Sequence, residues 1–119
     1  MPVRATMPLA FDLDARHEQF VAAAFDKSGV VLAHLRINSE HCDHTDVRFR
    51  DIFTMALGCD AFVLAVAHTH PSGDPKPSRT DIRMTRTLAQ LCKDLDIHLA
   101  DHLILARGGR FSFREAGLL

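Results

Sequence analysis

The sequence lacks several features that define large classes of proteins. None of its 119 residues is tryptophan or tyrosine, and its longest clean apolar run, residues 61–67, is far shorter than the ~18 residues of a membrane-spanning helix. No charged start followed by an apolar run marks a secretory signal. The cysteines Cys42, Cys59 and Cys92 are odd in number and widely spaced, which argues against a disulfide framework or a cysteine-based zinc ribbon. We therefore expect one globular domain in the reducing cytoplasm.

An excess of one charge is also missing. The net charge of −1 gives no electrostatic reason for non-specific nucleic-acid binding, and the aromatic residues form no set suited to stacking on single strands. The sequence contains no H-E-x-x-H, no P-C-x-x-C and no phosphate-binding glycine loop, which removes the helical zinc proteases, the zinc deaminases and nucleotide-binding loops. It does contain eight histidines and only three glutamates, a composition that invites a metal-binding or acid–base interpretation.

Apolar patterning predicts an α/β domain. The β-branched or continuous apolar runs predict strands at 19–25, 30–37, 61–67, 97–106 and 110–113, and helical spacing predicts helices at 46–57 and 78–95. Prolines and glycine between the third strand and the second helix exclude regular structure there. Residues 1–15 are weakly patterned and predict a loose tail, which leaves 16–119 as the domain. Alternating strands and helices indicate a layered sandwich with a mixed sheet.

The helix that begins at Ser78 carries an acidic residue on its apolar side. Its apolar stripe comprises Met84, Leu88, Leu91, Cys92 and Leu95. Asp81 projects into this stripe, while Arg79, Arg83, Arg86 and Lys93 lie opposite, as a solvated face or a contact for phosphate or an acidic partner. Ser78-x-x-Asp81 is a capping box. A carboxylate that faces a core also needs a partner, because an unpaired buried charge is costly.

His68 and His70 are the nearest candidates for that partner. Residues two apart in an extended segment point the same way, so both imidazoles leave the buried strand on one face. Neutral imidazole nitrogens suit zinc, and a carboxylate as third ligand leaves a fourth position open for water. A rigid loop then leads to the inward-facing Asp81. Together these residues predict a zinc site.

The same residues reproduce a known spacing. The JAMM zinc metallopeptidase motif, H-x-H-x7-S-x2-D, is matched by His68, His70, Ser78 and Asp81. The sequence from AHTHPSGDPKPSRTDIR to FSFREAGL also resembles the RadC family, whose bacterial members are commonly labelled DNA repair proteins. The resemblance is strong over 48–119, fainter over 18–37 and absent from the first fifteen residues. Thr69 stands where relatives usually have asparagine. The resemblance implies a JAB/MPN-like (cytidine-deaminase-like) sandwich, a mixed central sheet flanked by helices.

The resemblance also implies roles for individual residues. His68, His70 and Asp81 would bind the zinc ion, and Ser78 would donate a hydrogen bond to the oxyanion, although its capping role competes for the same hydroxyl. A glutamate would act as general base. The first choice is Glu18, which lies in an E-x-F motif that resembles the opening strand of the family, and the alternative is Glu40. Asp101 and His102 match a D-H word of the family and would either support the site from a second shell or form a structural pair.

The function expected from this resemblance is zinc-dependent hydrolysis of an amide or isopeptide bond in a protein or peptide. The alternative is a non-catalytic DNA-processing or mobile-element accessory module with the same fold. His41, Cys42 and His44 lie in a polar segment, interpreted as a solvated loop or a second metal site. Edge strands near Val30 or Phe111 could pair two copies of the chain.

Overall fold

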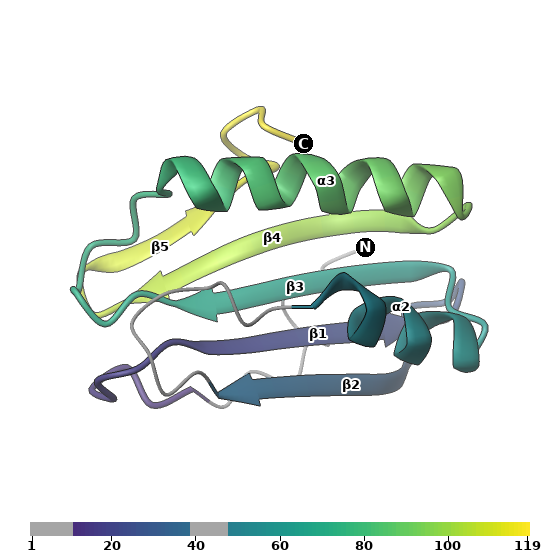
Figure 1. Ribbon diagram of the computed structural model, residues 1–119, viewed down its shortest axis with the longest axis horizontal. Helices are drawn as coiled ribbons and strands as arrows, with labels where there is room; N and C mark the ends of the chain where they lie inside the picture. Colours follow the sequence, from purple (N-terminus) through teal and green to yellow (C-terminus); the bar gives the residue numbers. More distant parts are fainter. Residues whose placement is uncertain (1–10, 39–47) are drawn as a thin grey trace.

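The computed structural model of this chain describes residues 11–38 and 48–119. Within them the chain forms seven elements (Figure 1), namely β1 (Gln19–Phe25), β2 (Val31–Asn38), α2 (Phe49–Gly58), β3 (Val63–Thr69), α3 (Arg79–Asp94), β4 (His98–Ala106) and β5 (Gly109–Ser112). Each corresponds to a predicted element. The predicted tail up to residue 10 and the predicted start of the first helix lie outside the described residues.

The strands form one mixed sheet in the order β2-β1-β3-β4-β5. β3 and β4 are parallel and are joined by the crossover through α3, while the other neighbouring pairs are antiparallel. β1 and β3 lie in the middle of the sheet, and every residue of both strands is buried. Their continuous apolar sequences explain this position, because a strand that alternates with polar residues would expose one face. β2 and β5 form the two edges, as predicted.

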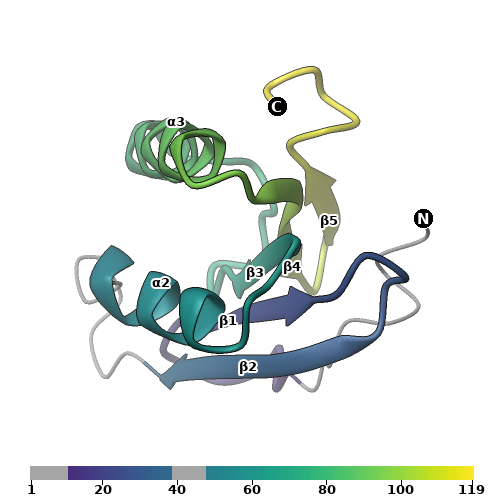
Figure 2. The same ribbon diagram turned by 90° about the vertical axis from the view of Figure 1, so that its right-hand side faces the viewer.

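Both described helices pack on the same face of the sheet (Figure 2). The core on that face brings Ile52 of α2 and Leu88 of α3 against Phe20 and Leu64 of the central strands. A second cluster, which includes Val21 and residues of β3 and β4, fills the opposite face of the sheet. The α/β class and the mixed sheet are therefore confirmed. No helix among the described residues is long and apolar enough to cross a membrane.

Two local details differ from the prediction. β3 continues through His68 and Thr69, because Thr69 still pairs with Leu105 of the parallel neighbour β4. α3 ends at Asp94, and Leu95 is its C-cap with 40% of its surface exposed, so the prediction that Leu95 belongs to the buried stripe is wrong. The remaining buried positions of α3 are Asp81, Thr85, Leu88 and Cys92, which recur at helical spacing on one face.

Candidate metal centre

The site begins at the end of β3. His68 lies on the face of β3 that packs under α3 and is 2% exposed. His70 follows just beyond the strand, where its backbone N–H donates to the carbonyl of Leu105 in β4. This bond extends the parallel pairing and keeps the segment stretched, so the two imidazoles share one face. Their Nε2 atoms lie 3.1 Å apart.

Asp81 reaches the same point from the first turn of α3. Its Oδ1 lies 3.3 Å from His68 Nε2 and its Oδ2 lies 3.0 Å from His70 Nε2. The side chain is fully buried. The capping box fixes it, because Ser78 N–H donates to Asp81 Oδ2 at 2.8 Å and Asp81 N–H donates to Ser78 Oγ at 3.0 Å. The cap that begins the helix therefore also aims the carboxylate at the histidines.

The tautomer of His70 follows from the contact that its Nδ1 makes. Nδ1 lies 2.9 Å from the carbonyl oxygen of Asp74. A carbonyl only accepts hydrogen bonds, so Nδ1 carries the proton and Nε2 of the neutral ring is an acceptor directed at Asp81 and His68. Acceptor atoms only 3.0–3.3 Å apart repel one another unless a cation or protons lie between them.

The spacing of the two histidine nitrogens and the two carboxylate oxygens of Asp81 fits a metal ion. Zinc–nitrogen and zinc–oxygen bonds of about 2.0–2.1 Å place neighbouring ligands of a tetrahedral site about 3.3 Å apart. The separations among His68 Nε2, His70 Nε2 and Asp81 carboxylate oxygens are 3.0–3.3 Å. Two imidazoles and one carboxylate are also a donor set that zinc accepts. The residues present therefore fit a zinc-type cation with further positions for water or substrate.

Electrostatics at the site favour a positive charge. Burial is the largest single effect on His70 and opposes its protonation, but the hydrogen bonds to Asp81 and Asp74 and the charges of Asp81 and Glu18 together raise the pKa of His70 above its ordinary value. Burial alone would favour a neutral Asp81, yet the hydrogen bonds from His68 and His70 lower the pKa of the carboxyl far below its usual range. Asp81 is therefore a carboxylate, and the centre that it shares with the two histidines attracts a cation.

Glu18 lies beside the histidine pair. It directly precedes β1, whose Phe20 pairs with His68, so the antiparallel register carries Glu18 toward the level of His70. A carboxylate oxygen of Glu18 and one nitrogen of each histidine lie within 4.8 Å of one another, and Glu18 is 6% exposed. Glu18, His68 and His70 therefore form a group that could hold a metal ion. The structure thus brings a second buried acid to the site.

Ser78 lies at the rim of the site, exposed at the start of α3. In the capping box its Oγ accepts a hydrogen bond from Asp81 N–H. A hydroxyl has one proton and two lone pairs, so accepting this bond does not consume its proton. The two roles expected of Ser78 therefore use different parts of the hydroxyl, since capping takes a lone pair and donation would take the proton.

The predicted pair Asp101 and His102 is divided between two environments. His102 is fully buried, and its Nε2 lies 2.8 Å from His68 Nδ1. Asp101 instead holds the C-terminal segment: Oδ2 accepts from Ser112 Oγ at 2.5 Å, and Oδ1 accepts from the backbone N–H of Arg114 at 3.1 Å. His102 thus contacts a candidate ligand, whereas the contacts of Asp101 are those of a structural residue.

Sequence reasoning missed Thr85. It lies one helical turn after Asp81, is 1% exposed, and contacts His102 Nδ1 through its hydroxyl at 2.6 Å. The i, i+4 spacing from Asp81 was the available signal. Glu40, His41, Cys42 and His44 lie outside the described residues.

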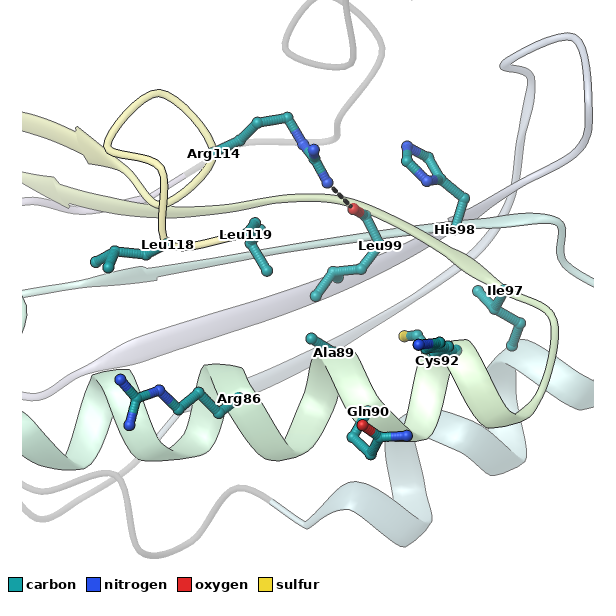
Figure 3. Close-up of a pocket in the computed structure, with 11 residues that line it drawn as sticks. Arg86, Ala89, Gln90, Cys92, Ile97, His98, Leu99, Arg114, Leu118 and Leu119 are labelled. Atoms are coloured by element: carbon teal, nitrogen blue, oxygen red, sulfur yellow. Dashed lines mark hydrogen bonds between the residues drawn. The ribbon is translucent and has the colours of Figure 1, made fainter.

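A groove lies farther along α3, between that helix, the start of β4 and the C-terminal segment (Figure 3). It measures about 530 Å³. Basic or imidazole side chains line it together with apolar ones; the former are Arg86, Lys93, His98 and Arg114. The Arg114 guanidinium donates to the carbonyl oxygens of Leu99 and Ala100, so it also ties the C-terminal segment to β4.

Comparisons with known proteins agree with the geometry. Residues 3–118 match the family model described as a RadC-like JAB domain, so the expectation that the resemblance is absent from the first fifteen residues is wrong. The chain is 38% identical over 102 residues to a UPF0758 protein of Rhodobacter capsulatus, which covers 86% of this chain and 48% of the relative. A UPF0758 protein of Ruegeria pomeroyi is also 38% identical over 102 residues, covering 86% of this chain and 46% of the relative. The chain spans about half the length of these curated relatives.

Proposed function

This chain belongs to the RadC-like JAB domain family, and on that premise we propose that it is a zinc-dependent hydrolase of amide or isopeptide bonds. The observation that carries the proposal is the convergence of His68 Nε2, His70 Nε2 and the Asp81 carboxylate within 3.0–3.3 Å. These three residues would hold the ion. They come from the end of a central strand and the start of the following helix, two rigid elements of the fold.

The bound ion would supply Lewis acidity, which acidifies a water molecule and polarises a carbonyl. Glu18 is the general base of the proposal. Its buried carboxylate lies within 4.8 Å of one nitrogen of each histidine, so a water molecule held at the centre would be within its reach. Glu18 would accept a proton from that water and later return it to the leaving amine. Such a positioned base contributes about 10²–10⁴-fold to the rate.

Ser78 would stabilise the developing oxyanion. Its Oγ is held 3.0 Å from Asp81 N–H, so the hydroxyl is fixed by the helix that supplies a ligand. Because the cap uses a lone pair, the hydroxyl proton can be donated to the substrate oxygen. Removal of one such donor typically reduces turnover by about 10²–10³-fold.

The proposal is tested by measuring zinc and hydrolysis separately. The chain, purified without chelators, should take up one zinc ion per molecule by elemental analysis. Asp81→Asn should lose the ion, because the amide retains an oxygen for Ser78 N–H but removes the charge. Glu18→Gln should keep zinc and lose hydrolysis of a peptide and isopeptide mixture followed by mass spectrometry. His98→Gln is a matched control, since β4 places this exposed residue opposite Val63, five residues before His68.

Two results would contradict parts of this proposal. Zinc uptake by the parent chain no greater than that of Asp81→Asn would remove the metal site. Loss of zinc in Glu18→Gln as well as in Asp81→Asn would make Glu18 a ligand and remove its role as base.

A second candidate is a DNA-processing or mobile-element accessory module that does not require catalysis. The specific observation in its favour is the groove along α3, whose lining includes Arg86 and Lys93 but no acidic residue. Binding to a duplex should weaken steeply with salt and fall further in Arg86→Glu, while His70→Gln leaves it unchanged. Flat titrations at low salt would dismiss this candidate.

A further inference from the structure

Behind the candidate metal centre, a series of buried hydrogen bonds connects two of its residues. His68 Nδ1 lies 2.8 Å from His102 Nε2, His102 Nδ1 lies 2.6 Å from Thr85 Oγ1, and Thr85 Oγ1 lies 2.7 Å from the backbone carbonyl oxygen of Asp81. All four residues are at most 2% exposed. This series of hydrogen bonds therefore begins at one candidate ligand, Asp81, and ends at another, His68. It links α3 to β3 through β4.

The direction of each bond follows from its end at Asp81. A carbonyl oxygen only accepts, so Thr85 donates its single hydroxyl proton there. Thr85 Oγ1 must then accept from His102 Nδ1–H. His102 is fully buried, stacked on the Phe113 ring with 4.6 Å between the ring centroids, and burial favours a neutral imidazole. Its Nε2 is consequently an acceptor, and the bond to His68 requires a proton on His68 Nδ1.

A proton on Nδ1 leaves His68 Nε2 as the acceptor that faces Asp81 and His70. This is the tautomer that can bind a metal through Nε2. His70 is set in the same tautomer by the Asp74 carbonyl. Both histidines therefore have the same tautomer, but different groups fix it: a backbone carbonyl for His70, and the side chains of His102 and Thr85 for His68.

We propose that Thr85 and His102 are positioning residues that fix His68 as its Nδ1-protonated tautomer and so present Nε2 to the metal. The proposal rests on the zinc site proposed above. Neither residue touches the ion; each acts through the next group in the chain. Without the Thr85 hydroxyl, His102 can adopt its other neutral tautomer, with its single ring proton on Nε2. It would then donate to His68 Nδ1, and the ring proton of His68 would have to lie on Nε2, the metal-binding nitrogen.

The test compares two substitutions at Thr85. Thr85→Val removes the hydroxyl at nearly constant shape and should weaken zinc binding by about tenfold, the lower end of the range for groups that orient a metal ligand. Thr85→Ser keeps the hydroxyl and should return the affinity to near the parent value. Thr87→Val is the matched control, because Thr87 makes the same bond to the carbonyl four residues earlier, that of Arg83, on the exposed side of α3. Affinities come from competition with a chromophoric chelator.

A second measurement reads the tautomer directly and needs no metal. Long-range ¹H–¹⁵N correlation spectra of the metal-free chain at about pH 9, where imidazoles are neutral, distinguish protonated Nδ1 from protonated Nε2. The parent chain and Thr85→Ser should show His68 protonated at Nδ1. Thr85→Val should shift His68 toward protonation at Nε2, and Thr85→Ala serves the same purpose should the valine variant fold poorly.

The outcomes separate this proposal from the one on which it rests. If the parent protein binds no zinc but shows the expected tautomers, the proposed zinc site is refuted and the proposed arrangement of protons stands. Zinc affinities and tautomers that are equal in the parent, Thr85→Val and Thr85→Ser overturn the positioning role. An equal loss in Thr85→Val and Thr85→Ser also overturns it, because packing rather than the hydroxyl would then matter.

Discussion

Replacement of Gly108 by alanine tests how the β4–β5 turn supports the metal loop. Gly108 N–H donates to the carbonyl oxygen of Gly73 at 2.9 Å, and a methyl group at Gly108 would overlap that oxygen. The obstacle is a backbone atom, so no side-chain rotation relieves it. Gly73 belongs to the loop that follows His70, and its own N–H donates to the His70 carbonyl at 3.1 Å. The overlap must therefore be relieved by displacing either the turn or the loop.

The expected loss of stability has two parts. Overpacking of this kind costs about 1–3 kcal/mol, and loss of the Gly108–Gly73 hydrogen bond costs about 0.5–1.5 kcal/mol. The free energy of unfolding should fall by about 1.5–4.5 kcal/mol, and the middle of this range corresponds, for a domain of this length, to a Tm lower by roughly 10 °C. Zinc affinity should fall as well, because the loop carries the carbonyl of Asp74 that orients His70.

The assay is thermal unfolding followed by circular dichroism, with zinc and with a chelator. Gly58→Ala is the matched control: Gly58 is the last residue of α2, and a methyl group there meets nothing within 4 Å. This control should raise stability by a few tenths to 1 kcal/mol, because alanine loses less entropy in a helix. A Gly108→Ala chain that melts with the parent, or a Gly58→Ala chain that melts equally early, would refute the reasoning.

The fold was accessible from sequence because its central elements are patterned without ambiguity. The run from Ala61 to Ala67 is apolar on both faces, and β3 is indeed a middle strand with both faces buried. Local patterns failed where partners distant in sequence decide. His68 and Thr69 look like the start of a loop, but pairing with β4 keeps them in the strand. Leu95 fits the apolar stripe of α3, but the helix ends one residue before it.

The candidate site divides in the same way. His68, His70 and Asp81 were found because the spacing of strand, loop and helix brings them together over only 14 positions, and Asp81 is buried as its place on the stripe predicted. The contact between His68 and His102 spans 34 residues and depends on the register between β3 and β4, which the sequence alone does not provide. Adjacent residues 101 and 102 face different partners for a local reason, since successive side chains of a strand point to opposite faces.

Two further predictions concern ionisable groups. Burial raises the pKa of the Cys92 thiol to about 11, so a thiol reagent at neutral pH should label half-buried Cys59 well before Cys92, as measured by mass spectrometry of the labelled peptides. In the metal-free chain, the raised pKa of His70 contributes stability that is complete below the ordinary histidine pKa of 6.5 and is lost as pH rises through the pKa of His70 in the folded state. The lowered pKa of Asp81 contributes stability that is present above the ordinary aspartate pKa of 3.8. Urea unfolding in a chelator should therefore show a histidine contribution that declines as pH rises above the ordinary value of 6.5 and is absent in His70→Gln. The stabilisation by zinc should instead grow as pH rises, because protons compete for its ligands. Parallel pH dependences with zinc and with chelator would show that protons and metal do not share this centre.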